Sequence, residues 1–246
     1  MLPLVRPYEY LIVQALLLRA GDCPLADVVT HAKHSVRDFD QAVFDHALRF
    51  MLATGYFSSD GVRLALNGIV LDVEFSDYLQ DLLDYGLGKF DVDYSDVRPG
   101  ERFRLWAKYR KEQVQMLLLH NPRDIMKGTA IYDGVAYMYV TVLKDDNIKS
   151  ELRYMDGYID ERTFQWETVA NVSDRELDAL KSARLAHIFV RKVELEDGIV
   201  LPFTYIGSGT MEYVEGSKKP NGAHLFRIAM DSPAPEDVYF DFKLPV

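Results

Sequence analysis

The feature that most constrains the fold is a change of residue pattern near the middle of the chain. Beyond residue 128, seven segments are rich in β-branched and aromatic residues, namely AYMYVTVL, RYMDGYI, TFQWETV, HIFVRKVEL, FTYIGSG, HLFRIAM and VYFDFKL. These residue types favour strands, and turn sequences such as Pro220-Asn221-Gly222 separate them. A capping-box sequence from Ser173 to Glu176 predicts a helix between them, and a further helix is expected over 110–119. We predict a strongly curved sheet or small barrel with two helices.

The first hundred residues have the apolar periodicity of helices. Three helices are expected over 8–18, 24–34 and 37–57, and the Asp60-Gly61 turn predicts a small hairpin after them. This order is that of a winged helix. A fourth helix is expected around Phe75, beginning at Ser76 and ending at Gly86 or Gly88. The segment DVDYSDVRPGE then reads as a linker. The predicted class is α+β, with a winged-helix-like domain over 1–100 and a mostly β domain over 101–246.

Composition and charge narrow the class of protein. The chain is 48% hydrophobic and carries a net charge of −10, which argues against a general coat protein for nucleic acids. Residues 101–127 are different, because they hold seven basic residues against three acids, which is a hint of a surface for phosphate. A solvated helix face explains the same pattern. The single cysteine, Cys23, and the lack of a signal peptide or spanning segment favour a cytoplasmic protein without membrane association.

Several segments of the second half, in order, resemble a known module. They are WAKYRKEQV, YMYVTVLKDDNI, YMDGYIDERTFQWET, HIFVRK and FTYIGSG. The resemblance is to the domain of unknown function 3427, the C-terminal module of restriction-type superfamily-2 helicase proteins, and it covers roughly Phe103 to Leu244. It implies a PUA-like domain that recognises a DNA target, by flipping and reading a modified base, in modification-dependent restriction enzymes. The chain departs from such enzymes because it has no helicase core, no nuclease and no G-x-x-x-x-G-K-[ST] loop.

An aromatic and acidic stretch in this half is the candidate base pocket. Tyr154, Asp156 and Tyr158 alternate and share one face of a strand. Phe164 and Trp166 share one face of the next strand, and the short link between them predicts a hairpin. Aromatic faces replace the stacking that a flipped base loses, and a carboxylate accepts from the cytosine N4 amino group. In the alternative interpretation, Phe164 and Trp166 are core residues and Asp156 caps a turn.

Basic residues around this stretch are the candidate phosphate contacts. Three cluster at an expected helix start, where backbone N–H groups favour anions. Three flank the aromatic strand, and two lie in the polar loop GSKKPNG. The set is Lys108, Arg110, Lys111, Lys144, Lys149, Arg153, Lys218 and Lys219.

Sequence motifs of enzymes and metal sites are missing. The chain lacks G-x-S-x-G, H-E-x-x-H and CxxC. His31 and His34 have helical spacing but no acid or cysteine beside them. Asp241-Phe242-Lys243, preceded by Asp237, resembles a nuclease pattern, but the segment is expected to be a strand. We therefore expect no catalysis, no metal and no cofactor.

The sequence leaves two functions open. The first is noncatalytic recognition of double-stranded DNA, including duplexes with a modified base, in a restriction or defence system that uses a helicase or nuclease. The second is a protein-interaction module that docks onto a helicase or nuclease partner. The acidic charge favours docking, and the basic segment and aromatic hairpin favour DNA.

Overall fold

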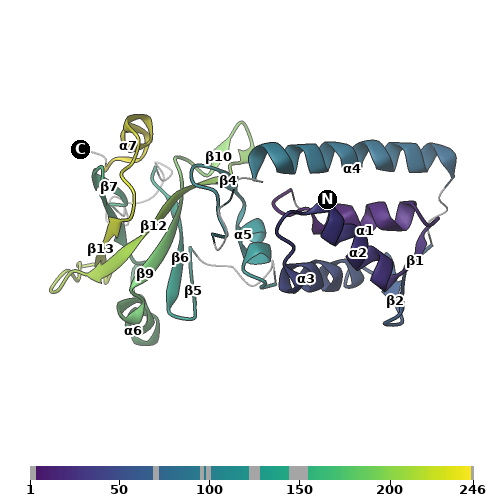
Figure 1. The fold of residues 1–246 in the computed structure, drawn as a ribbon. Helices are drawn as coiled ribbons and strands as arrows, with labels where there is room; N and C mark the ends of the chain where they lie inside the picture. The colour runs from purple at the N-terminus through teal and green to yellow at the C-terminus, as the bar shows by residue number, and fades with distance from the viewer. Residues whose placement is uncertain are drawn as a thin grey trace. The chain divides into compact units, whose positions relative to one another are not determined.

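The structure is a computed structural model that describes residues 4–68, 72–94, 97, 101–121, 128–143 and 155–244. Its class is α+β, as predicted, and it consists of two compact units (Figure 1). Unit 1 is Met1–Arg104 with Gln115–Asn121, and unit 2 is Leu105–Val114 with Pro122–Val246. The first segment of unit 1 ends at Arg104, and a short later segment, Gln115–Asn121, also belongs to unit 1.

Hydrogen bonds from arginine side chains hold that later segment. The Arg6 guanidinium donates from Nη1 to the Met116 carbonyl oxygen at 3.0 Å, and Arg102 donates to the Leu117 carbonyl oxygen at 2.8 Å. Arg6 also donates from Nε to Glu9 Oε1 at 2.7 Å, and both side chains are fully buried. Burial raises the pKa of the Glu9 carboxyl group. Sequence periodicity gives no signal for the contact between Arg6 and Met116, because these two residues are 110 positions apart in the chain.

Unit 1 has the element order of a winged helix. Three helices and a small three-stranded sheet of order β1-β3-β2 surround one core, and a long fourth helix follows them. The elements are α1 (Tyr8–Leu17), β1 (Asp22–Pro24), α2 (Leu25–Ser35), α3 (Gln41–Leu52), β2 (Phe57–Ser59), β3 (Arg63–Leu66) and α4 (Val73–Asp93). The strand β1 between the first two helices was not predicted.

Helix α4 differs from its prediction at both ends. Asp72, rather than Ser76, caps its start, because its Oδ1 accepts from the Phe75 N–H at 2.8 Å. The helix does not end at Gly86 or Gly88 but continues to Asp93. Gly86 is buried, and a Cβ atom there would lie 2.0 Å from Cε1 of Tyr10. This glycine therefore allows close packing on α1 and does not terminate the helix.

Unit 2 is built on an open sheet. The strand order is β5-β6-β9-β12-β13-β8-β7, with β4 paired to one end of β12. All pairs are antiparallel except β6 with β9. Among the described strands, β5 and β7 form the edges and do not close a barrel. The strands are β4 (Lys108–Tyr109), β5 (Thr129–Tyr132), β6 (Val135–Thr141), β7 (Gly157–Asp160), β8 (Thr163–Glu167), β9 (Leu185–Arg191), β12 (Phe203–Tyr213) and β13 (Leu225–Met230).

Helices and a hairpin complete unit 2. They are α6 (Asp174–Ser182), α7 (Glu236–Phe242) and the two-stranded hairpin of β10 (Leu195–Glu196) and β11 (Ile199–Val200), while α5 (Lys111–Leu117) spans the boundary between the units. Ser173 caps α6 as predicted, with its hydroxyl accepting from the Glu176 N–H at 3.3 Å.

The prediction of a strand at VYFDFKL is wrong, because this segment forms α7. Pro235 precedes the helix, and Glu236 and Asp237 occupy its first turn. Proline and acidic residues at these positions favour a helix start.

Candidate nucleic-acid interface

The predicted hairpin forms from β7 and β8, with Tyr158 opposite Phe164 and Gly157 opposite Gln165. Tyr158, Phe164 and Trp166 all lie in the core of unit 2. The Tyr158 and Phe164 rings meet edge to face at 5.2 Å between centroids. These rings pack on other rings inside the protein, so they present no open face to a base in this structure. Tyr154 lies outside the described residues.

The Tyr158 hydroxyl group is buried and has no hydrogen-bond partner in the described part of the chain. Burial alone raises the pKa of this phenol. The side chain is therefore an apolar core element that carries one unsatisfied polar atom.

Asp156 is buried and belongs to the end of the same hairpin. Its Oδ1 accepts a hydrogen bond from the Glu167 backbone N–H at 2.8 Å. This bond fixes the last residue of β8 against the residue that precedes β7. The aspartate therefore positions the neighbouring glutamate, a role that resembles the capping alternative more than the pocket.

Glu167 is the residue that the sequence interpretation missed. Its side chain is only 2% exposed, and its Oε1 accepts from Nζ of Lys219 at 2.5 Å. The second oxygen, Oε2, is buried and has no hydrogen-bond partner among the described residues. We call Asp156, Glu167 and Lys219 the acidic centre. A buried carboxylate oxygen that accepts nothing is costly, and a donor from a ligand would satisfy it.

A second buried glutamate shows what distinguishes the acidic centre. Glu9 in unit 1 also has one carboxylate oxygen, Oε2, that finds no hydrogen-bond partner within the residues that the structure describes. Its cation, Arg6, is only 2% exposed, so that pair is enclosed by the core. Lys219, by contrast, is 37% exposed and lies on a polar loop. Of these two pairs, only the one at Glu167 has a cation that reaches solvent.

The loop that carries Lys219 is tied to the end of β8. The Thr168 hydroxyl accepts from the His224 N–H at 3.0 Å, and the Thr168 N–H donates to the His224 carbonyl oxygen at 2.9 Å. The neighbouring Lys218 is exposed. The fold thus brings two of the predicted phosphate contacts to the acid-bearing end of the hairpin. Lys144, Lys149 and Arg153 lie outside the described residues.

The three basic residues around β4 lie together but are not equally open. Lys108 and Arg110 are exposed. Lys111 packs over the rings of Tyr139 and Phe203, at 5.4 and 5.9 Å from their centroids. Burial, with a smaller effect from nearby Arg191, lowers the pKa of its ammonium group. Lys111 therefore has a structural role in addition to any contact with phosphate.

A polar and aromatic cluster on the sheet was also missed. The His187 ring stacks on Tyr137 at 5.2 Å between centroids and shares a 2.7 Å hydrogen bond between Nδ1 and the Tyr205 hydroxyl group. Burial lowers the His187 pKa to about 4, against a raising effect of Asp231. The Ser208 hydroxyl donates to Asp231 at 2.6 Å. This pattern differs from a serine hydrolase triad, in which the serine bonds to the histidine.

The histidines and aspartates that the sequence singled out for metal or nuclease chemistry lie on helices of the structure. In the described part of the chain, no three His, Cys, Asp or Glu residues could hold a metal ion together. Asp237 and Asp241 lie on helix α7, and Asp241 pairs with Lys192 at 3.3 Å. His31 is hydrogen bonded to Gln14 at 2.9 Å. No helix among the described residues is long and apolar enough to cross a membrane.

Comparisons with known proteins extend these observations. Residues 103–242 match the domain of unknown function DUF3427. No curated protein matches the chain. Among solved structures, the chain is similar to the 5-hydroxymethylcytosine-specific restriction enzyme AbaSI, with 10% sequence identity and a TM-score of 0.28. That similarity covers 68% of this chain and spans 60% of the enzyme's chain.

Proposed function

Because the chain belongs to the DUF3427 family, which matches it over residues 103–242, we propose that unit 2 is a noncatalytic DNA-recognition module. The observation that carries the proposal is the acidic centre. It sets a buried carboxylate acceptor beside the ammonium group of Lys219, which is the pair of functions that a base edge and a phosphate backbone require.

The carboxylate of Glu167 supplies the selectivity for a base. The exocyclic amino group of cytosine is a donor, and carboxylates accept from it. Thymine has a carbonyl oxygen at the corresponding position and leaves the carboxylate unsatisfied. Asp156 assists by holding the Glu167 backbone through its 2.8 Å hydrogen bond.

The position of Lys219 decides whether a base can reach the Glu167 carboxylate. Its Nζ occupies one carboxylate oxygen, but the side chain is part-exposed on a loop. A DNA phosphate competes for the ammonium group, and movement of Lys219 toward the backbone uncovers Glu167 for a flipped base. Flipping a base out of the duplex costs a few kcal/mol of free energy. We therefore expect the site to bind bases that already stack poorly or carry a modification.

The test is a titration of the full chain with short duplexes that contain thymine, cytosine, 5-methylcytosine or 5-hydroxymethylcytosine at one position, at two salt concentrations. Fluorescence anisotropy gives the dissociation constants. Glu167→Gln keeps the side-chain shape but replaces one acceptor by a donor. We expect it to remove the preference for the duplexes with a cytosine base over the duplex with thymine, a difference of about 1–3 kcal/mol, while nonspecific affinity persists.

Glu212→Gln is the matched control, because Glu212 is exposed on β12 of the same sheet. It should leave both affinity and preference unchanged. An unaltered preference in Glu167→Gln, or a wild-type protein that binds no duplex, would contradict the proposal. Absence of strand cleavage with added Mg²⁺ tests the noncatalytic part separately.

The alternative, a module that docks onto a helicase or nuclease partner, does not compete for the acidic centre. Its specific support lies in unit 1, where α4 is strongly acidic. DNA recognition and protein docking are therefore compatible functions of different units.

A further inference from the structure

Helix α4 has a large apolar surface that faces away from the core of unit 1. Phe75 is 40% exposed, and Tyr78, Leu82, Tyr85 and Val92 are between 56% and 75% exposed. Single exposed apolar side chains are ordinary, but a contiguous row of them marks an interaction surface. These five residues form what we call the apolar stripe.

The spacing of the stripe is that of a helix-packing seam. Successive positions 75, 78, 82, 85, 89 and 92 are separated alternately by three and four residues, and only Lys89 among them is polar. This is the repeat by which one helix packs along another. The helix packs on unit 1 through other positions, with Leu83 and Gly86 buried. The stripe is thus a second apolar face of α4, and it is not the one that holds the fold together.

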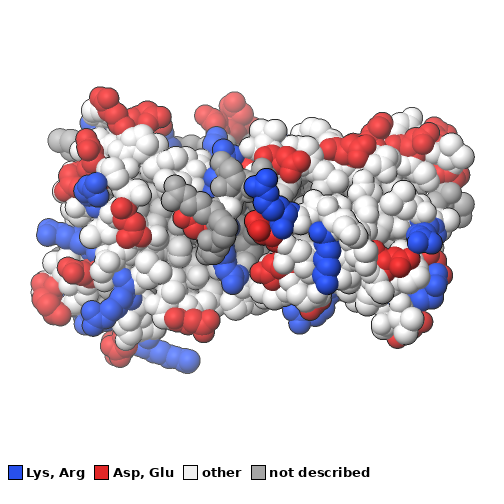
Figure 2. Space-filling view, in the orientation of Figure 1, with Lys and Arg blue, Asp and Glu red and all other residues white. Residues whose placement is uncertain are grey.

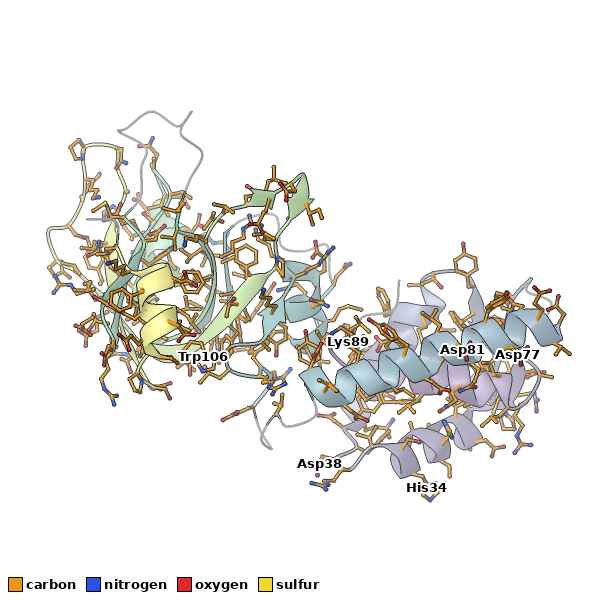
Figure 3. The ribbon with its side chains drawn as sticks, turned by 90° about the horizontal axis from the view of Figure 1, so that it is seen from above. His34, Asp38, Asp77, Asp81, Lys89 and Trp106 are labelled. Carbon is orange, nitrogen blue, oxygen red and sulfur yellow. The ribbon has the colours of Figure 1, made fainter. Side chains whose placement is uncertain are left out.

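The charges beside the stripe are almost all of one sign. Helix α4 contains six acidic residues and one lysine, and that lysine, Lys89, is already paired with Asp93. Asp77, Asp81, Asp84 and Asp91 are exposed. Figure 2 shows acidic side chains gathered along the helix, and Figure 3 shows Asp77 and Asp81 on its outward side. Asp77 and Asp81 form no ion pair among the described residues.

We propose that the apolar stripe binds an amphipathic helix of another protein that carries Lys and Arg beside its own apolar seam. Charge complementarity selects this occupant, because a basic flank would neutralise Asp77 and Asp81. A second copy of the chain would bring the same surplus of acids and no free cation from α4. A helix laid in this way is an established mode of recognition, and the 21 residues of α4 give about 31 Å of length for it.

This proposal does not rest on DNA recognition, because it uses only residues of α4. The probes are three designed amphipathic helical peptides with the same apolar seam and with basic, neutral or acidic flanking residues. Each is titrated by fluorescence anisotropy against the full chain. We expect the basic peptide to bind, with an affinity that falls as salt is added, and the acidic peptide not to bind.

Variants separate the two parts of the surface. Leu82→Ser with Tyr85→Ser should weaken the basic peptide at least about tenfold, as expected for residues at the centre of an interface. Asp77→Asn with Asp81→Asn should reduce the preference for the basic over the neutral peptide. The matched control, Tyr56→Ser, removes an aromatic side chain that is 63% exposed elsewhere in unit 1 and should change nothing.

Three results would overturn the proposal. They are equal binding of basic and acidic peptides, no binding of the basic peptide, and a dimer in sedimentation that disappears in the Leu82→Ser, Tyr85→Ser variant, which would assign the stripe to a second copy. All the altered side chains are exposed, and circular dichroism of each variant shows whether it is folded.

Discussion

Two substitutions in α4, Gly86→Ala and Gly88→Ala, should change the free energy of unfolding of unit 1 in opposite directions. Both substitutions lie within one helix, and each gains about 1 kcal/mol of intrinsic helix propensity. They differ only in their surroundings. At Gly88 an added Cβ meets nothing within 4 Å, whereas at Gly86 it would lie 2.0 Å from Cε1 and 2.6 Å from Cδ1 of the Tyr10 ring.

The clash at Gly86 exceeds what small adjustments relieve. Carbon atoms pack at about 3.5–4.0 Å, so the ring must move by roughly 1.5 Å. Tyr10 is 3% exposed and packs in the core of unit 1. Overpacking of this kind costs about 1–3 kcal/mol, and more where nothing gives way. We therefore expect Gly86→Ala to destabilise unit 1 by up to about 2 kcal/mol and Gly88→Ala to stabilise it by about 0.5–1 kcal/mol.

Urea denaturation followed by circular dichroism measures both effects. Tyr10→Leu provides the internal check, because a smaller side chain at position 10 should remove most of the Gly86→Ala penalty in a double-mutant cycle. If the two glycine variants have the same stability, or if Tyr10→Leu leaves the Gly86→Ala penalty unchanged, the close approach of α4 to α1 is not as described.

Three further predictions concern unit 2. Burial lowers the pKa of His187 in the folded state to about 4, so the unfolded state takes up a proton near pH 6.5, before the folded state does. The free energy of unfolding therefore has its full value above pH 6.5 and decreases by up to about 3 kcal/mol as the pH falls toward 4. Urea titrations at several pH values should show a flatter profile for His187→Gln. Tyr158→Phe removes a buried hydroxyl without a partner and should hold or raise the melting temperature, whereas a clear fall would reveal a partner for that group. Replacing Lys108, Arg110 and Lys111 together by alanine should weaken the binding of all duplexes equally. It should also reduce the slope of log K against log salt concentration by up to about 0.9 for each phosphate that is no longer neutralised. An unchanged slope would show that these three residues do not contact the DNA backbone.

The sequence alone predicted the helices and strands whose residue patterns lie within a short stretch of the chain. The spacing of apolar residues predicted the first three helices of unit 1, and the capping box at Ser173 predicted α6. Alternation of aromatic residues predicted the hairpin of β7 and β8. In each case the residues that specify the element lie within one or two turns or along one strand pair.

Signals of two kinds competed in the segments that were predicted wrongly. At VYFDFKL, the β-favouring residues suggested a strand, although Pro235 and two acids mark a helix start. Strand propensity mostly reflects packing on neighbouring strands, and this segment does not join the sheet as a strand. Glycine at position 86 suggested a helix end, yet the close packing of Tyr10 explains it.

The candidate site depended most on tertiary structure. The sequence pointed to the acid-bearing hairpin, but it could not say which carboxylate is buried with an unpartnered oxygen. That assignment depends on Lys219, which pairs with Glu167 from 52 positions away in the chain. It also depends on the sheet, which places Phe164 and Trp166 in the core. Burial and pairing are properties of surroundings assembled from distant segments, and a pattern within fifteen residues does not contain them.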